Sequence, residues 1–168
     1  MSFNYSGSTF LSFAVTGELD DRDQRLFEAN EGLTANIVDD LLRQASQRIL
    51  TQIRNSDWWR TYQFGLDSTL ERDPRLLPSV DPDRIRSRIQ EFKDLNIYFA
   101  LSEYVYPRIA DFGNENDSSV QKIKFYRDQY LALFREVIES GDWYDFDDDG
   151  TVERRERLPN RQRLARIR

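Results

Sequence analysis

Carboxylates crowd a short stretch near the end of the 168-residue sequence, and their spacing suits a hard cation. Asp145, Asp147 and Asp149 alternate along the chain, Gly150 follows them, and Glu156 comes one helical turn or more later. In a tight loop alternate residues point inward, so the three aspartates converge, and a glycine permits the sharp reversal after them. Four aspartates within five residues would also repel one another unless a positive charge neutralised them.

The stretch 145–156 (DFDDDGTVERRE) fills every defined position of the EF-hand calcium loop, D-x-[DN]-x-[DN]-G-x5-E. The predicted Ca²⁺ ligands are the side chains or carbonyls of Asp145, Asp147, Asp149, Thr151, Glu153 and Glu156. Asp148 should point outward and is not a predicted ligand. Magnesium fits less well, because it prefers near-octahedral geometry with retained water. The alternative is an acidic loop that is solvated or paired with the arginines directly after it.

The segments around this loop depart from an ordinary EF-hand. The preceding helix is predicted to end near Ser140, with Gly141 in the gap, and Pro159 leaves little room for a helix after Glu156. The pattern also occurs once, whereas sensors usually pair two loops. These features favour a fixed structural ion over a sensor that moves helices.

The composition removes most kinds of catalytic site. The sequence has no cysteine and no histidine, so thiolate zinc sites, disulfides, cysteine nucleophiles and the commonest general base are all excluded. No apolar run approaches the roughly 20 residues of a membrane span, and the first residues do not resemble a signal peptide. We therefore expect a soluble protein made in a cytoplasm that is not an enzyme.

Three amphipathic helices are predicted to position the loop. The first runs from about Thr34 to Asn55, with Thr34 as N-cap. The second runs from Asp81–Pro82 to about 109, with a kink or end near Pro107. The third runs from Asp117–Ser118 to Gly141. The buried stripe of the first helix comprises Ile37, Leu41, Leu42, Ala45, Ile49, Leu50 and Ile53. Between the helices, Trp58–Trp59 is expected to pack in the core, and residues 61–82 are expected to be irregular.

The predicted fold is all-α: an antiparallel bundle of three to four helices with an extended arm at each end. Residues 1–33 form the N-terminal arm, with a short β-strand at Thr9–Thr16 and a loop over the acidic run GELDDRDQ. The bundle spans 34–141, the EF-hand-like loop 142–156 and a basic tail 157–168. Residues 154–168 carry seven Arg and one Glu, a charge of +6, so the net charge of −6 leaves −12 for the rest. Such a tail is expected either to meet an acidic surface or nucleic acid, or to be solvated.

Three segments of the chain resemble head–tail connector (adaptor) proteins of tailed bacteriophages: LLRQASQRI, KDLNIYFALSEYVYPRIADF and SVQKIKFYRDQYLALFREVIESGDWYDFDDDGTV. The resemblance covers roughly residues 34–156 and implies a structural virion protein, made in the host cytoplasm, at the head–tail interface. It implies a homo-oligomeric ring, typically a dodecamer, that contacts the portal and the tail or neck proteins and passes DNA through its lumen. No membrane partner is expected.

Two other functions are compatible with the sequence. The chain could be a monomeric calcium-binding module, although the single loop and the altered flanks argue against it. A metal-dependent hydrolase is the weakest hypothesis, because no nucleophile-and-base pair accompanies the aspartates.

Overall fold

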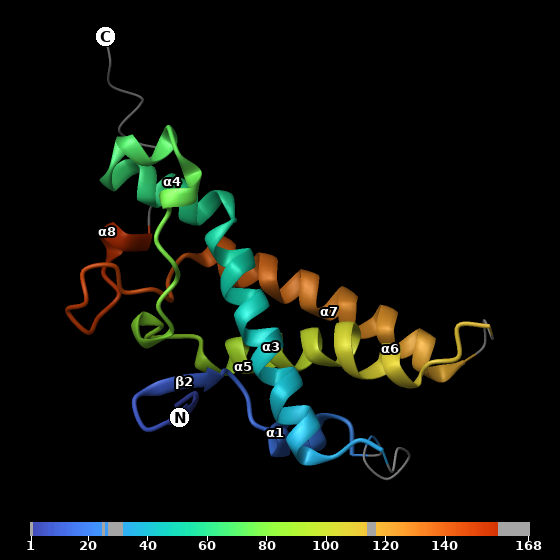
Figure 1. Cartoon of the computed structure of the whole chain (residues 1–168). Helices are drawn as coiled ribbons and strands as arrows, with labels where there is room; N and C mark the ends of the chain where they lie inside the picture. The colour runs from blue at the N-terminus through green and yellow to red at the C-terminus, as the bar shows by residue number, and fades with distance from the viewer. Residues whose placement is uncertain (1, 25, 27–31, 114–116, 158–168) are drawn as a thin grey trace. The chain divides into compact units, whose positions relative to one another are not determined.

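The computed structural model describes residues 2–24, 26, 32–113 and 117–157, and most of them are helical (Figure 1). They form two compact units. The first combines residues 1–49 with 89–135, and the second combines residues 50–88 with 136–168. The mostly helical content confirms the predicted class, with a small two-stranded sheet added, and it is compatible with the predicted bundle.

The N-terminal segment folds onto the first unit. Strands β1 (Asn4–Ser6) and β2 (Thr9–Ser12) form an antiparallel hairpin whose turn contains Gly7 at φ +62°. The acidic run predicted to be a loop is helix α1 (Thr16–Arg22). That prediction was wrong because α1 is too short to show an apolar period: Leu19 is its one buried residue, and the Glu18 carboxylate accepts the Val15 N–H at 3.0 Å.

Helix α3 (Ala35–Arg54) confirms the first predicted helix. Thr34 Oγ1 accepts a hydrogen bond from the Ile37 N–H at 3.4 Å, as an N-cap should. The buried stripe is also as predicted except at its start, where Ile37 is 36% exposed and Val38 is buried instead. Asn96, in helix α5 (Ile89–Ala100), donates to the Leu42 carbonyl and accepts from the Ala14 N–H, so it joins α3 to the N-terminal segment.

The second predicted helix begins later than the sequence indicated. Pro82–Arg84 is only a 3-10 turn, η3, capped by Asp81, and α5 runs from Ile89 to Ala100. A π-helical segment, η4 (Leu101–Val105), and the short α6 (Tyr106–Ile109) continue it. The helix ends at Ile109, as predicted, and the π-helical segment lies just before Pro107, whose missing N–H an unbroken α-helix would not accommodate.

Helix α7 (Ser118–Ser140) confirms the third predicted helix, with the Asp117 carboxylate accepting from the Ser119 N–H and Gly141 at φ +60° after its end. Its first part packs beside α5 and α6 in the first unit (Figure 1). Stacked rings join Tyr126 to Tyr98 and to Tyr106, and Tyr130 meets Phe99 edge to face.

In the second unit, α4 (Asp57–Leu66) is capped by Ser56, whose side chain accepts a hydrogen bond from the Trp59 N–H. The 3-10 turns η1 (Ser68–Glu71) and η2 (Pro74–Leu76) follow, and α8 (Arg154–Arg157) overlaps the last residues of the acidic loop. The irregular region therefore starts at residue 67 and not at 61, because Gly65 is tolerated in the last turn of α4. Trp59 is 1% exposed, which confirms its core packing. Beyond Arg157 the predicted basic tail lies outside the described residues.

None of the helices within the described ranges is long and apolar enough to span a membrane.

Candidate metal site

The start of the acidic loop is fixed by strand-like pairing with the segment before α5. The Arg86 N–H donates to the Trp143 carbonyl at 3.0 Å, the Asp145 N–H donates to the Arg84 carbonyl at 3.0 Å, and Ile85 pairs with Tyr144. Arg88 in this segment has φ +55°, which turns the chain into α5. The pairing requires extended backbone at Ile85, which has φ −80° and ψ 104°, and this is why the predicted helix does not continue through that residue.

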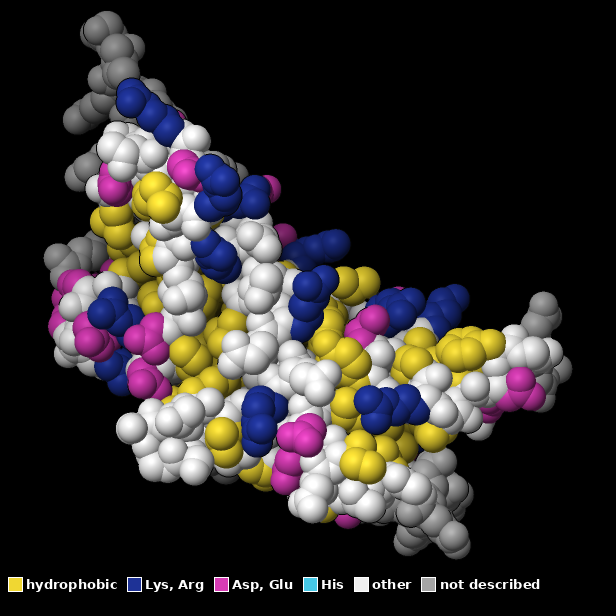
Figure 2. All heavy atoms as spheres, in the orientation of Figure 1, with side chains coloured by type: hydrophobic (Ala, Val, Ile, Leu, Met, Phe, Trp, Pro, Cys, Tyr) yellow, Lys and Arg dark blue, Asp and Glu magenta, His cyan; other side chains and the backbone are white. Residues whose placement is uncertain are grey.

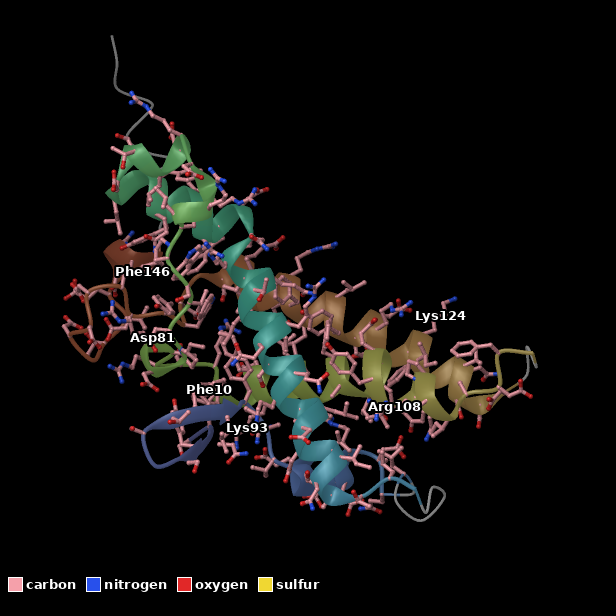
Figure 3. All side chains as sticks on the ribbon, viewed as in Figure 1. Phe10, Asp81, Lys93, Arg108, Lys124 and Phe146 are labelled. Atoms are coloured by element: carbon pink, nitrogen blue, oxygen red, sulfur yellow. The ribbon has the colours of Figure 1, made fainter. Side chains whose placement is uncertain are left out.

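Buried and half-buried aromatic side chains pack around the first residues of the loop. Trp143 and Tyr144 are buried, and Phe146, at the second position of the loop, packs against α4 (Figure 3). The Phe146 ring stacks on Tyr62 at an interplanar angle of 13° and on Trp59 at a centroid distance of 5.5 Å. These contacts belong to the second unit and hold the first residues of the loop in one place.

The structure brings together three of the predicted ligands. Carboxylate oxygens of Asp145, Asp147 and Asp149 all lie within 4.8 Å of one another. Asp147 and Asp149 are exposed, whereas Asp145 is fully buried. Gly150 adopts φ +91°, a left-handed conformation that favours glycine, and thereby provides the predicted reversal after the aspartates.

The two oxygens of Asp145 have different surroundings. Oδ2 accepts hydrogen bonds from the Gly150 N–H at 2.8 Å and from Arg86 Nε at 3.2 Å. Oδ1 is buried, and no donor reaches it from the residues that the structure describes. A buried acceptor without a partner costs about 1–3 kcal/mol, and more when it is charged. The geometry therefore leaves a carboxylate oxygen that a cation would satisfy.

The charge of Asp145 is nevertheless maintained. Burial by itself would raise the pKa of this carboxyl, but the Gly150 N–H and the Arg86 guanidinium, with smaller contributions from the amides of Asp148 and Asp149, hold the pKa below its ordinary value. Asp145 is thus ionised at neutral pH, the form in which a carboxylate binds a metal.

Glu156 is buried and joins the two ends of the loop. Its Oε1 accepts from the Phe146 N–H at 2.7 Å and from the Asp147 N–H at 3.3 Å, and its Oε2 accepts from the Glu153 N–H at 2.7 Å. In this conformation Glu156 binds the loop's own backbone and is outside the cluster of three aspartates. Its predicted role as the closing metal ligand stays a prediction.

The other two predicted ligands are exposed. The Thr151 N–H and hydroxyl both donate to Asp149 Oδ1, at 2.9 and 2.8 Å, so they orient that carboxylate. Glu153 lies at the surface just before α8. Asp148, not predicted as a ligand, is exposed at φ +60°.

Sequence reasoning missed two arginines at this site. Arg86 binds Asp145 and, through Nη2, Asp148 Oδ1 at 3.1 Å, while Arg84 binds the Phe146 carbonyl at 2.9 Å and lies 3.7 Å from Asp148 Oδ2. Acidic and basic side chains accordingly intermingle over this loop (Figure 2). The available signal was the alternation of Arg84, Arg86 and Arg88, which is typical of an extended segment with one charged face.

Comparison of the chain with known protein families, with curated proteins and with solved structures finds no match.

Proposed function

We propose that residues 145–156 bind one Ca²⁺ ion as a structural element of a non-catalytic assembly protein. The observation that carries the calcium site is the Asp145 carboxylate: it is fully buried, one of its oxygens has no donor among the described residues, and it lies beside the carboxylates of Asp147 and Asp149. The buried oxygen distinguishes this cluster from a solvated acidic loop.

The chemistry of the donors selects the ion. Every candidate ligand is an oxygen, and the chain has no histidine or cysteine to favour a transition metal. Asp145, Asp147 and Asp149 would supply the first carboxylates, and the Thr151 carbonyl and Glu153 would add to them. Glu156 would complete the shell by exchanging part of its backbone hydrogen bonds for the ion.

The elements around the loop support a fixed ion. A sensor needs long helices on both sides of the loop, so that binding changes the angle between them. Here α7 ends at Ser140, five residues before Asp145, and α8 has four residues. The pairing of residues 143–145 with 84–86 also holds the entry to the loop.

The wider role that we propose is a ring-forming structural protein of the head–tail connector kind, joining a portal to a tail and passing DNA. It is supported by the resemblance of residues 34–156 to such proteins. Large exposed apolar side chains in the first unit, Phe112 (67%), Phe125 (56%) and Leu131 (54%), suit a protein with partners. The alternative is a monomeric calcium-binding module with the same loop.

The calcium site is tested by unfolding and by luminescence. All three tryptophans of the chain, Trp58, Trp59 and Trp143, belong to the second unit, so tryptophan fluorescence follows the melting of the unit that contains the loop. Ca²⁺ at about 100 times its dissociation constant should stabilise this unit by about 2.7 kcal/mol. Terbium(III) should show emission sensitised by Trp143, two residues before Asp145.

Two matched variants make this test specific. Asp145→Asn should abolish the calcium-dependent shift and the terbium signal, whereas Asp148→Asn, the same change in the same loop, should preserve both because Asp148 faces the arginines. Equal responses of the two variants, or a wild-type protein whose melting ignores Ca²⁺, would refute the site.

The proposed assembly has a separate test. Light scattering after size-exclusion chromatography measures the mass in solution, and negative-stain microscopy shows whether rings form, alone or on added portal protein. A monomer under all these conditions would favour the monomeric module.

A further inference from the structure

Arg86 engages one oxygen of the Asp145 carboxylate and leaves the other without a donor among the described residues. Its Nε donates to Asp145 Oδ2, the oxygen that also accepts the Gly150 N–H, while the buried Oδ1 has no donor among the described residues. Arg86 and Gly150 together therefore fix the orientation of this carboxylate: Oδ2 accepts both hydrogen bonds, and Oδ1 accepts none from the described residues.

The same guanidinium also reaches the loop's outward-facing aspartate. Nη2 of Arg86 lies 3.1 Å from Asp148 Oδ1. One side chain thus bridges a proposed ligand and a residue that is not a ligand. Four aspartates within five residues repel one another, and the ion pairs of Arg86 with Asp145 and Asp148 offset part of that repulsion.

A positive charge in this place also acts on an incoming cation. Calcium binds carboxylate oxygens at roughly 2.3–2.6 Å, so an ion on Oδ1 would lie within roughly 7 Å of the guanidinium that holds Oδ2. This separation is shorter than the Debye length of about 8 Å at physiological ionic strength. The Arg86 side chain is 39% exposed, so solvent reduces the repulsion without removing it.

We propose that Arg86 is a resident counter-ion of the loop, which stabilises the metal-free loop and lowers its affinity for Ca²⁺. The inference rests on the proposed calcium site. It explains how a loop with this charge stays folded before an ion arrives, and it means that the loop binds calcium more weakly than its carboxylates alone would.

The experiment compares four proteins: wild type, Arg86→Gln, Arg86→Lys and Arg84→Gln. Calorimetric titration with CaCl₂ measures the dissociation constant, and tryptophan fluorescence in EDTA measures the melting temperature of the metal-free second unit. Arg84→Gln is the matched control, since Arg84 belongs to the same segment and contacts Asp148 and the Phe146 carbonyl instead of Asp145.

Arg86→Gln should bind Ca²⁺ about tenfold more tightly than wild type and melt at a lower temperature in EDTA, because a unit charge is removed close to the ion. Arg86→Lys keeps the charge, and its affinity should stay within about threefold of wild type. Arg84→Gln should tighten binding by less than about threefold, since Arg84 contacts Asp148 and the Phe146 carbonyl, whereas Arg86 holds the proposed ligand Asp145.

The outcomes separate this inference from the proposed function. If wild type binds Ca²⁺ and Arg86→Gln binds no more tightly, the counter-ion role is overturned while the calcium site stands. Equal tightening in Arg86→Lys or in Arg84→Gln also overturns it, because the effect would then not follow the charge at this position. If wild type itself binds no Ca²⁺, both proposals fall.

Discussion

Replacement of Asp23 by asparagine tests a buried carboxylate of the first unit that accepts hydrogen bonds from three side chains. Asp23 follows α1 and is 9% exposed. Its carboxylate accepts hydrogen bonds from Tyr106, from Tyr126 at 3.3 Å and from Lys122 Nζ at 2.9 Å. These contacts join the N-terminal segment to α6 and α7.

The expected loss of stability follows from these contacts. A hydrogen bond to a charged group contributes about 1.5–3 kcal/mol, and asparagine would weaken two or three of them. It keeps one acceptor oxygen, and the Lys122 side chain, 43% exposed, can be hydrated instead. We expect Asp23→Asn to lower the free energy of unfolding by about 2–4 kcal/mol, or the melting temperature by about 4–16 °C at roughly 2–4 °C per kcal/mol for a chain of this size.

The effect should depend on pH in a defined direction. Burial would raise the pKa of Asp23, but the hydrogen bonds from Tyr106 and Lys122 outweigh it and hold the pKa below its ordinary value. A lowered pKa contributes stability above the unfolded-state pKa of about 3.9, and this contribution is lost as the pH falls through the folded-state pKa. The difference between wild type and Asp23→Asn should therefore be constant from about pH 5 to 8 and shrink below about pH 4.

Thermal melting followed by far-ultraviolet circular dichroism measures this difference. Asp21→Asn is the matched control, since Asp21 is exposed on α1 and its replacement should change stability by no more than about 0.5 kcal/mol. A loss below 1 kcal/mol in Asp23→Asn, or a difference that persists unchanged below pH 4, would refute the reasoning.

Two further predictions concern aromatic side chains. Phe146→Ala should lower the free energy of unfolding of the second unit by about 2–3 kcal/mol, because Phe146 stacks on Tyr62 and is half-buried. Phe112→Ala is the control and should be nearly neutral, because Phe112 is 67% exposed. Urea unfolding followed by tryptophan fluorescence and circular dichroism measures both changes. The free energy of unfolding should also fall as the pH rises above about 10. Burial is the main cause that raises the pKa of Tyr126 and of Tyr144 to about 12. The folded state therefore keeps these protons at a pH where the unfolded state loses them, and the stability that they contribute is lost as the pH rises. Melting temperatures that are equal at pH 9 and pH 11.5 would contradict this.

Local features of the sequence were enough to predict the long helices and the form of the acidic loop. The caps at Thr34 and Asp117, the apolar stripe of α3 and the end of α7 at Gly141 all depend on residues within a few positions of one another. The same holds for the alternating aspartates and for Gly150, whose spacing determines that their carboxylates converge. Such features can be read from one chain because helix and loop geometry repeat over short distances.

Tertiary contacts decided the rest. Ile85 has the right spacing to continue the apolar face of α5 toward the N-terminus, but its pairing with Tyr144, far along the chain, holds it extended. Local sequence features also could not predict which arginines bind the acidic loop. Arg84 and Arg86, which precede the loop by about 60 residues, bind it, although other arginines follow it directly. Coulomb attraction favours a nearby opposite charge whatever its place in the sequence, so only the folded chain determines which arginine comes close. The sequence by itself thus determined which carboxylates this loop brings together, and the tertiary structure determined that Asp145 keeps one buried oxygen without a donor among the described residues.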